Sequence, residues 1–335
     1  MNCLVRCEKG IPFLVFALLL AFLSGCVTTT TNDWFEAAES GKAAVIEALL
    51  EKETDPNKKN NDGDTALIVA SRYGQTGVLQ VLLEQEELEI DARSNKGVTA
   101  LNEGAKEGYA AVVQLLLDAG TDVHLRDNEG KTALLFAAKH GHVNILQSLL
   151  AAGAKVSDRD NQGSDALILA AKEGYTGAIQ VLLDSGASVQ TRNNEGVTSL
   201  MAATSKSHTD TIKLLLEKES DPNARRNDSL TVLMIAVEED SFNTCEMLIE
   251  AGSDPNGRDN KGRTALMLAS QKGNEEIVRL LLDNWADPKA RDNEERTAAD
   301  YAEEGEHSNI LPILEEEREE PEDEETPVEE EDQEE

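Results

Sequence analysis

The sequence predicts an all-α solenoid, in which helix-turn-helix units with β-hairpin fingers stack one against the next. Three observations support this prediction: a fixed period, paired glycines, and apolar residues at helical spacing. A period of 33 residues is typical of stacked repeats in which each unit contacts only its neighbours. The periodic position holds Thr132, Asp165, Thr198, Thr231, Thr264 and Thr297, and Thr65 and Thr99 extend it backwards with one extra residue in the first unit.

Two glycines recur at fixed places in each full unit. The first is at the tip of an Asn-x-Gly turn, where it permits the positive φ of a hairpin: Gly63, Gly97, Gly130, Gly163, Gly196 and Gly262. The second separates the two helices of a unit: Gly74, Gly108, Gly141, Gly174 and Gly273. The Thr or Asp between the two glycines is expected to cap the first helix through its side-chain oxygen.

Apolar residues recur at helical spacing after the second glycine, as in Val78, Leu79, Leu82 and Leu83. No unit can bury this face alone, so stacking must supply the core. Cys245 lies in one of these aliphatic columns. We therefore expect it to pack as a small hydrophobe, the alternative being a reactive thiol.

Residues 194–259 depart from the pattern. Ser207 and Asp240 replace the second glycine, and Ser229 replaces the first. A non-glycine residue at positive φ costs about 1 kcal/mol or more. The unit over 227–259 lacks both glycines, so we predict that it is the softest internal unit.

The two ends of the array are expected to be caps. The half-unit from Trp34 to Gly41 lacks the finger glycine and the Thr, and its second helix is predicted over about residues 43–50. The last unit, 293–314, has polar Asp300 and the acidic run Glu303–Glu306 where other units are apolar or basic. Polar outer faces are what terminal repeats require.

The repeated residues also carry a resemblance. The pattern Gly130-x-Thr132-Ala133-Leu134-x-x-Ala137, then Gly141-His142, then Leu149-Leu150-x-x-Gly153-Ala154, resembles the ankyrin repeat over residues 32–314. The resemblance implies the fold and a protein-binding concave face, formed by the fingers and the first helices, and it implies no chemistry. One departure is that Ala, Ser or Val follows the Thr, where the ankyrin repeat usually has Pro.

Residues 1–25 are predicted to be a signal peptide. Arg6 and Lys9 precede an apolar run of 13 residues, 11–23, which is too short to span a membrane. Leu23-Ser24-Gly25-Cys26 resembles the bacterial lipoprotein signal, which implies palmitate and other acyl chains on Cys26 and a stable anchor. A plain secretory signal is the alternative. Residues 26–31 would form a tether. In the lipoproteins that this sequence resembles, an Asp immediately after the lipidated cysteine often retains the protein at the inner membrane. No acid stands immediately after Cys26, so the resemblance favours the outer membrane, with the protein facing the periplasm.

The chain is strongly acidic, with a formal net charge of −34. The last 21 residues, 315–335, contain 15 acids and one Arg, which leaves about −21 for residues 26–314. We expect the tail to be disordered. Nucleic acid is a poor partner for such a surface, whereas a basic protein suits it.

No catalytic or cofactor motif is present in the sequence. The pair His140-x-His142 could bind a metal weakly, but it has no third ligand at metal-site spacing. We therefore predict that the chain is not an enzyme, has no cofactor and has no small-molecule substrate.

Two charged columns are candidates for recognition. From Thr99 onward, arginine precedes each periodic Thr or Asp by six residues, and we favour pairing of each Arg with an acid on an adjacent finger over a basic stripe for an acidic partner. That column is Arg93, Arg126, Arg159, Arg192, Arg225, Arg258 and Arg291. The second column, near the end of the first helix, is basic at first and changes sign at Glu238. Around it we predict partner contacts by Arg72, Tyr73, Lys106, Lys139, His140 and Lys172, the alternative being ordinary solvated helix ends.

Taken together, these features predict a non-catalytic protein–protein interaction module anchored to a bacterial membrane, with a basic protein as its partner. Two alternatives remain open from the sequence. One is an immunity-type inhibitor of a basic toxin or enzyme. The other is a structural envelope protein with a cation-binding acidic tail.

Overall fold

The computed structural model describes residues 31–315, in two compact units whose boundary follows Ala100. The predicted signal peptide (1–25), lipidated Cys26, the tether up to residue 30 and the acidic tail from residue 316 lie outside the described residues. None of the described helices is long and apolar enough to span a membrane.

The first unit contains two helical hairpins. Its helices are α2 (Thr31–Glu39), α3 (Ala43–Leu50), α4 (Ala66–Arg72) and α5 (Thr76–Leu83). The α2 helix packs on α4, and α3 packs on α5. Trp34, only 1% exposed, supplies the core of the terminal half-unit. The predicted helix over 43–50 is confirmed.

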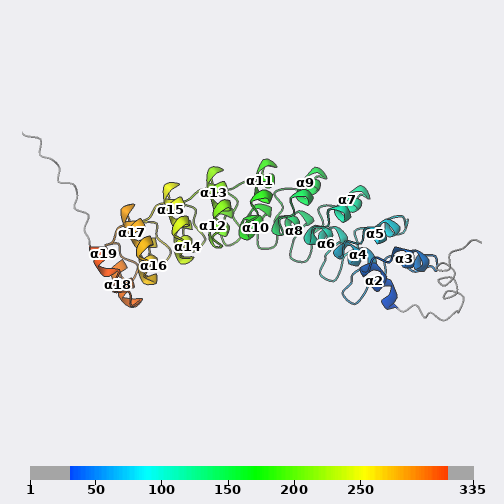
Figure 1. The fold of residues 1–335 in the computed structure, drawn as a ribbon, viewed down its shortest axis with the longest axis horizontal. Helices are drawn as coiled ribbons and strands as arrows, with labels where there is room; N and C mark the ends of the chain where they lie inside the picture. The colour runs from blue at the N-terminus through cyan, green and yellow to red at the C-terminus, as the bar shows by residue number, and fades with distance from the viewer. Residues whose placement is uncertain (1–30, 316–335) are drawn as a thin grey trace, which may run out of the picture. The chain divides into compact units, whose positions relative to one another are not determined.

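The second unit continues the same alternation. Its helices are α6 (Ala100–Glu107), α7 (Ala110–Asp118), α8 (Ala133–Lys139), α9 (Val143–Ala151), α10 (Ala166–Glu173), α11 (Thr176–Asp184), α12 (Ser199–Thr204), α13 (Thr209–Glu217), α14 (Val232–Glu238), α15 (Phe242–Glu250), α16 (Ala265–Lys272), α17 (Glu275–Asp283), α18 (Ala298–Glu304) and α19 (Leu311–Glu315). From α8 to α18 the first helices pack on one another, and from α7 to α19 the second helices do the same (Figure 1). The predicted stacking of helix pairs is confirmed.

At seven of the recurring positions the Thr or Asp caps a first helix as predicted. Its side-chain oxygen accepts a hydrogen bond from the backbone N–H three residues later, at 2.9 Å for Asp165 and Ile168. Burial raises the pKa of the Asp165 carboxyl. The caps are Thr65, Thr132, Asp165, Thr198, Thr231, Thr264 and Thr297.

The core is a stack of aliphatic columns. Cys245 is fully buried in α15, and so is the equivalent Val278 in α17. Burial raises the pKa of the Cys245 thiol to about 12, so the reactive thiolate is disfavoured. The expectation that Cys245 packs as a hydrophobe is confirmed.

The fingers are tight turns rather than extended hairpins. In one finger the Asp127 N–H donates to the Lys131 carbonyl (2.9 Å), and the Gly130 N–H donates back to the Asp127 carbonyl (3.1 Å). Gly130 has a φ of +80°, as this turn requires. Antiparallel bridges join Arg159 to Asp165 and, two repeats further along the chain, Arg225 to Thr231.

Neighbouring fingers are joined by asparagines, and we call these contacts the finger ladder. The Asn161 N–H donates to the Glu129 carbonyl (2.9 Å), and its carboxamide donates to the Asn128 carbonyl (3.0 Å). A Cβ on Gly130 would lie 2.4 Å from the Asn161 side-chain oxygen. The tip glycine is therefore needed twice, for its backbone conformation and for the approach of the next finger. The carboxamide contact recurs at Asn95, Asn194, Asn227 and Asn293.

The positions that lack glycine have the strained backbone that the sequence predicts. Ser207, Ser229 and Asp240 have φ values of +53°, +64° and +55°. Asn260 follows the Ser229 finger and keeps the backbone bond to the Asp228 carbonyl (3.1 Å). Among the described fingers, however, its carboxamide does not join the finger ladder. The unit over 227–259 thus combines backbone strain with a weaker contact.

We expect amide hydrogen exchange to be fastest, among the internal units, in residues 227–259, because strain and the lost ladder contact lower its local stability. Ser229→Gly should raise the free energy of unfolding by about 1 kcal/mol in a urea titration and slow that exchange. Ser188→Gly, at a position without positive φ, is the matched control and should not stabilise. Uniform protection across all units would contradict the prediction.

Gly130→Ala should destabilise the chain more than Gly153→Ala. Both glycines have positive φ, +80° and +93°, so both substitutions cost about 1 kcal/mol in backbone strain. Only at Gly130 does the new methyl group collide with the next finger, since nothing lies within 4 Å of a Cβ at Gly153. Urea unfolding of the two variants measures the difference. Equal losses would mean that the finger ladder adds no steric constraint.

A candidate protein-binding groove

Fingers and first helices of the second unit enclose two adjoining cavities, which together we call the groove. The first has a volume of about 390 Å³ and lies between two fingers and the helices α8 and α10. The second has a volume of about 550 Å³ and extends to α12 and α14. Asn161, Gln162, Leu169 and Lys172 line both cavities, so the two form one depression.

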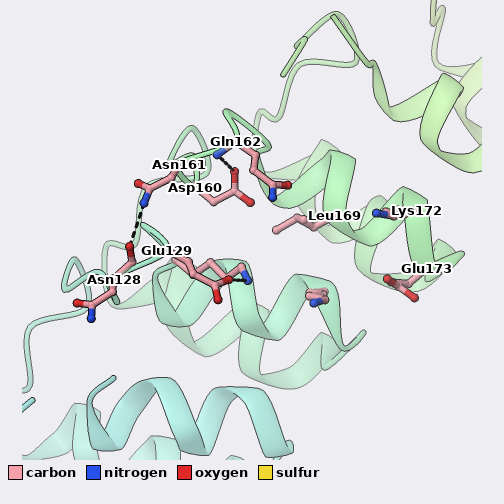
Figure 2. A pocket seen from close by; sticks show the side chains of 10 residues that line it. Asn128, Glu129, Asp160, Asn161, Gln162, Leu169, Lys172 and Glu173 are labelled. Carbon is pink, nitrogen blue, oxygen red and sulfur yellow. Dashed lines mark hydrogen bonds and ion pairs between the residues drawn. The ribbon is translucent and has the colours of Figure 1, made fainter. Parts of the chain in front are cut away.

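The first cavity is bounded by polar finger tips and by the end of α10. Figure 2 shows Asn128 and Gln162 on successive fingers, with Leu169, Lys172 and Glu173 on the helix opposite. The Asn161–Asn128 contact of the finger ladder holds the two fingers together at its edge. Because that contact fixes the fingers, this wall of the groove is formed before any partner arrives.

The floor of the second cavity is apolar. Its lining residues come from the same places in successive first helices: Ile168 and Leu169 in α10, Met201 and Ala202 in α12, and Ile235 in α14. Leu169 is half-buried, and the others are buried. A row of this kind offers an apolar partner side chain a surface that is partly removed from water already.

The structure brings two of the six predicted contact residues into the groove, Lys139 and Lys172. Lys106 lies outside it and pairs with Glu107 (2.7 Å) and Glu103 (3.7 Å). His140 is half-buried beside Lys139, and burial, followed by the charge of Lys139, lowers its pKa.

The other two predicted residues belong to the first unit. Arg72 Nη1 lies 2.8 Å from Asp64 Oδ2. Tyr73 is 45% exposed, and the nearby Glu39 carboxylate raises the pKa of its hydroxyl. Partner contact by any of the six residues stays a prediction.

The charged groups at the first cavity divide into paired and unpaired ones. Glu129 pairs with Lys131, and the Asp160 carboxylate accepts the N–H groups of its own turn. Within residues 31–315, the ammonium groups of Lys139 and Lys172 have neither an ion pair nor a hydrogen bond. Counted with Asp160 and exposed Glu173, the lining has three cations and three anions, so this end is distinguished by its two unpaired ammonium groups and not by a net charge.

The second cavity has the opposite character at its far end. Glu195, Glu238 and Glu239 line it, and all three are exposed. The cation there, Arg226, is bonded to Asp228 (Nε–Oδ1, 2.9 Å), and this bond lowers the pKa of the Asp228 carboxyl to about 2. With Arg226 neutralised, the three glutamates leave this end acidic.

The predicted pairing of the arginine column with acids is wrong at most positions. Each guanidinium mainly donates to a backbone carbonyl: Arg159 to the Arg192 carbonyl (3.2 Å), and Arg225 to the Arg258 carbonyl (2.8 Å). Arg126 combines such a bond with an ion pair to an acid on the adjacent repeat, Asp158 (2.6 Å). The acids after the arginines are occupied because they accept backbone N–H groups within their own fingers.

The histidines after the second-glycine position, which is Gly141 before His142 and Ser207 before His208, join successive repeats. His142 Nε2 lies 3.0 Å from the Lys106 carbonyl, and its ring packs where a Cβ on Gly108 would be. His208 repeats this arrangement at Lys172 and Gly174. The rings of His140 and His142 stack, with centroids 6.1 Å apart. Over residues 31–315 no group of three or more His, Cys, Asp or Glu side chains is placed to hold a metal ion.

Sequence reasoning missed Gln162 and the apolar floor of the groove. Gln162 is at the finger tip, where the equivalent residues Glu129, Glu195 and Lys261 are charged. The uncharged amide at this position was the signal that could have identified it. The floor residues share the helical spacing of the buried core. Spacing alone therefore could not separate them from it.

Comparison with known proteins agrees with this architecture. A family profile described as "Ankyrin repeats (3 copies)" matches residues 34–127, 104–193, 188–259 and 233–324. The crystal structure of the ankyrin repeat domain of Bcl-3, described as a unique member of the IkappaB protein family, is similar at 27% identity and a TM-score of 0.58. That match covers 65% of this chain and 100% of that one.

The search of curated proteins returned no match. The family profile matches well over half of the chain, and the fold, the finger ladder and the groove agree with it. This chain therefore belongs to the ankyrin-repeat family, whose arrays are protein–protein interaction modules and typically non-catalytic scaffolds.

Proposed function

We propose that the chain binds a basic protein partner non-catalytically, at a bacterial membrane to which lipid on Cys26 anchors it. The groove of the second unit is the observation that carries the proposal. It joins an apolar floor to fixed fingers and to charged groups that have no partner within the described residues. Buried apolar area supplies affinity and unpaired charges supply selectivity, which is the division typical of protein interfaces.

The overall charge supports a basic partner. Residues 26–314 have a net charge of about −21, and the 15 acids of residues 315–335 add to it. A field of this strength attracts a basic protein from a distance and is screened by salt. Lys139 and Lys172 form a local exception, so attraction at long range and docking in the groove depend on different residues.

The location is inferred from the N-terminus. Positive residues, a 13-residue apolar run and the sequence Leu23-Ser24-Gly25-Cys26 support export and lipidation. Two or more acyl chains make a stable anchor where one would be marginal. Our proposal puts the array on the periplasmic side of the outer membrane, because no acidic residue stands immediately after Cys26.

Affinity capture from envelope extract tests the partner. The full chain in mild detergent should retain one basic protein at low salt and release it at high salt. Lys139→Glu combined with Lys172→Glu should weaken retention about tenfold or more, because acidic groups of the partner that contact these lysines in the groove would then meet like charges. Lys155→Glu, on an exposed loop, is the control and should retain the partner. Capture of nothing, or of many basic proteins equally, would favour a structural or cation-binding role.

Metabolic labelling with an alkyne analogue of palmitate tests the anchor. The wild-type chain should be labelled and sediment with membranes, whereas Cys26→Ser should be unlabelled and lose membrane association. Cys245→Ala is the control, since that thiol is buried and should not accept lipid. A cleaved, unlabelled wild-type chain would instead indicate a plain secretory signal.

A further inference from the structure

The unpaired charges at the two ends of the groove are opposite in sign, and we infer that the groove binds an extended partner segment in one direction only. The acidic end of the segment lies on Lys139 and Lys172, its apolar middle on the floor, and its basic end on Glu195, Glu238 and Glu239. This inference rests on the proposed protein-binding function and adds the chemistry and the orientation of the bound segment.

The basic end is formed by two lysines at equivalent places, 33 residues apart. Lys139 is in the last turn of α8 and Lys172 in the last turn of α10, and both line the first cavity. Cations are favourable at helix C-termini, which accounts for their presence in the fold. No described acid pairs with either ammonium group, so both positive charges are available to a partner.

The acidic end has no such explanation in the stability of the fold. Glu238 is in the last turn of α14, which has no basic residue there, and Glu239 is its C-cap. A negative charge at a helix C-terminus is unfavourable because it meets the negative end of the helix dipole. The column therefore changes from a stabilising charge to a destabilising one while it stays on the groove. A requirement for binding explains that change.

The middle of the groove suits an apolar side chain and an extended backbone. Leu169, Ala202 and Ile235 occupy the same position in α10, α12 and α14, and all line the second cavity. The Gln162 side chain points across the groove toward Leu169 (Figure 2). Within the described residues its carboxamide has no hydrogen bond, so it can both donate to and accept from a peptide group.

The length of the segment follows from the helix spacing. Packed helices lie about 8–10 Å apart, so the three steps from α8 to α14 cover about 27 Å. An extended chain advances about 3.4 Å per residue, so about eight residues connect the two charged ends. A segment with one or two acids, an apolar centre and one or two basic residues matches this surface.

Selection from a displayed library of random twelve-residue peptides tests the inference. The full chain in mild detergent is the target, in parallel with Lys139→Glu/Lys172→Glu and Glu238→Lys/Glu239→Lys. Peptides selected on wild type should have acids toward one end and basic residues toward the other, in the same order. The lysine variant should lose the preference for the acidic end, and the glutamate variant the preference for the basic end.

A peptide selected on the wild-type chain should bind about tenfold or more weakly to Lys139→Glu/Lys172→Glu, and likewise to Glu238→Lys/Glu239→Lys. Fluorescence polarisation measures these affinities. Glu246→Lys/Glu250→Lys, on the second helix α15 of the same repeat, is the control and should leave affinity within about twofold. Circular dichroism establishes that each variant is folded.

The remaining outcomes separate the two proposals. Peptides that depend on groove residues but have no consistent order of charge would overturn the orientation and leave groove binding intact. Basic peptides weakened equally by the control variant would show that the outer acidic surface binds them, and would overturn the inference. No enrichment above a bare support would contradict both the orientation and the proposed use of the groove.

Discussion

The stacking of one finger on the next is the constraint on which the rest of the structure depends. A tip glycine such as Gly130 adopts a left-handed conformation and leaves room for the asparagine of the next finger, which bonds to two carbonyls of the finger before it. Backbone carbonyls that are not bonded within their own turn, such as those of Asn128 and Glu129, are satisfied in this way by the next repeat. Because each repeat needs its neighbour for both core and hydrogen bonds, the fingers form a fixed wall beside the first helices.

The same stacking decides which side chains are available for recognition. Arg159 and Arg225 donate to carbonyls of the next repeat, and His142 and His208 are bonded to carbonyls of the repeat before. These residue types suggest binding when read from sequence, yet here they connect repeats. Few charged side chains in the groove are left without such a contact. Among them are Lys139 and Lys172, at the ends of α8 and α10, and Glu238 and Glu239, at the end of α14.

The repeat period was sufficient to predict the fold because each position has one physical role in every unit. It located the helix caps, the buried column of Cys245 and the strained φ of Ser229. It could not identify the acceptors of the arginine column, because backbone carbonyls have no signature in sequence. Trp285 is a related case: it is 78% exposed at a φ of +69°, where the repeat before has Gly252, and the period marks it as an exception without giving a reason.

The charges of the groove show where stability and recognition separate. Lysine at the end of a first helix satisfies both, since it complements the helix dipole and stays exposed to a partner. Glutamate at the end of α14 satisfies only the second, because the same dipole opposes it. A surface shaped by stability alone would keep lysine in every repeat of this column. The reversal at Glu238 therefore identifies the column, better than any single residue in it, as the part of the array that is specialised for a partner.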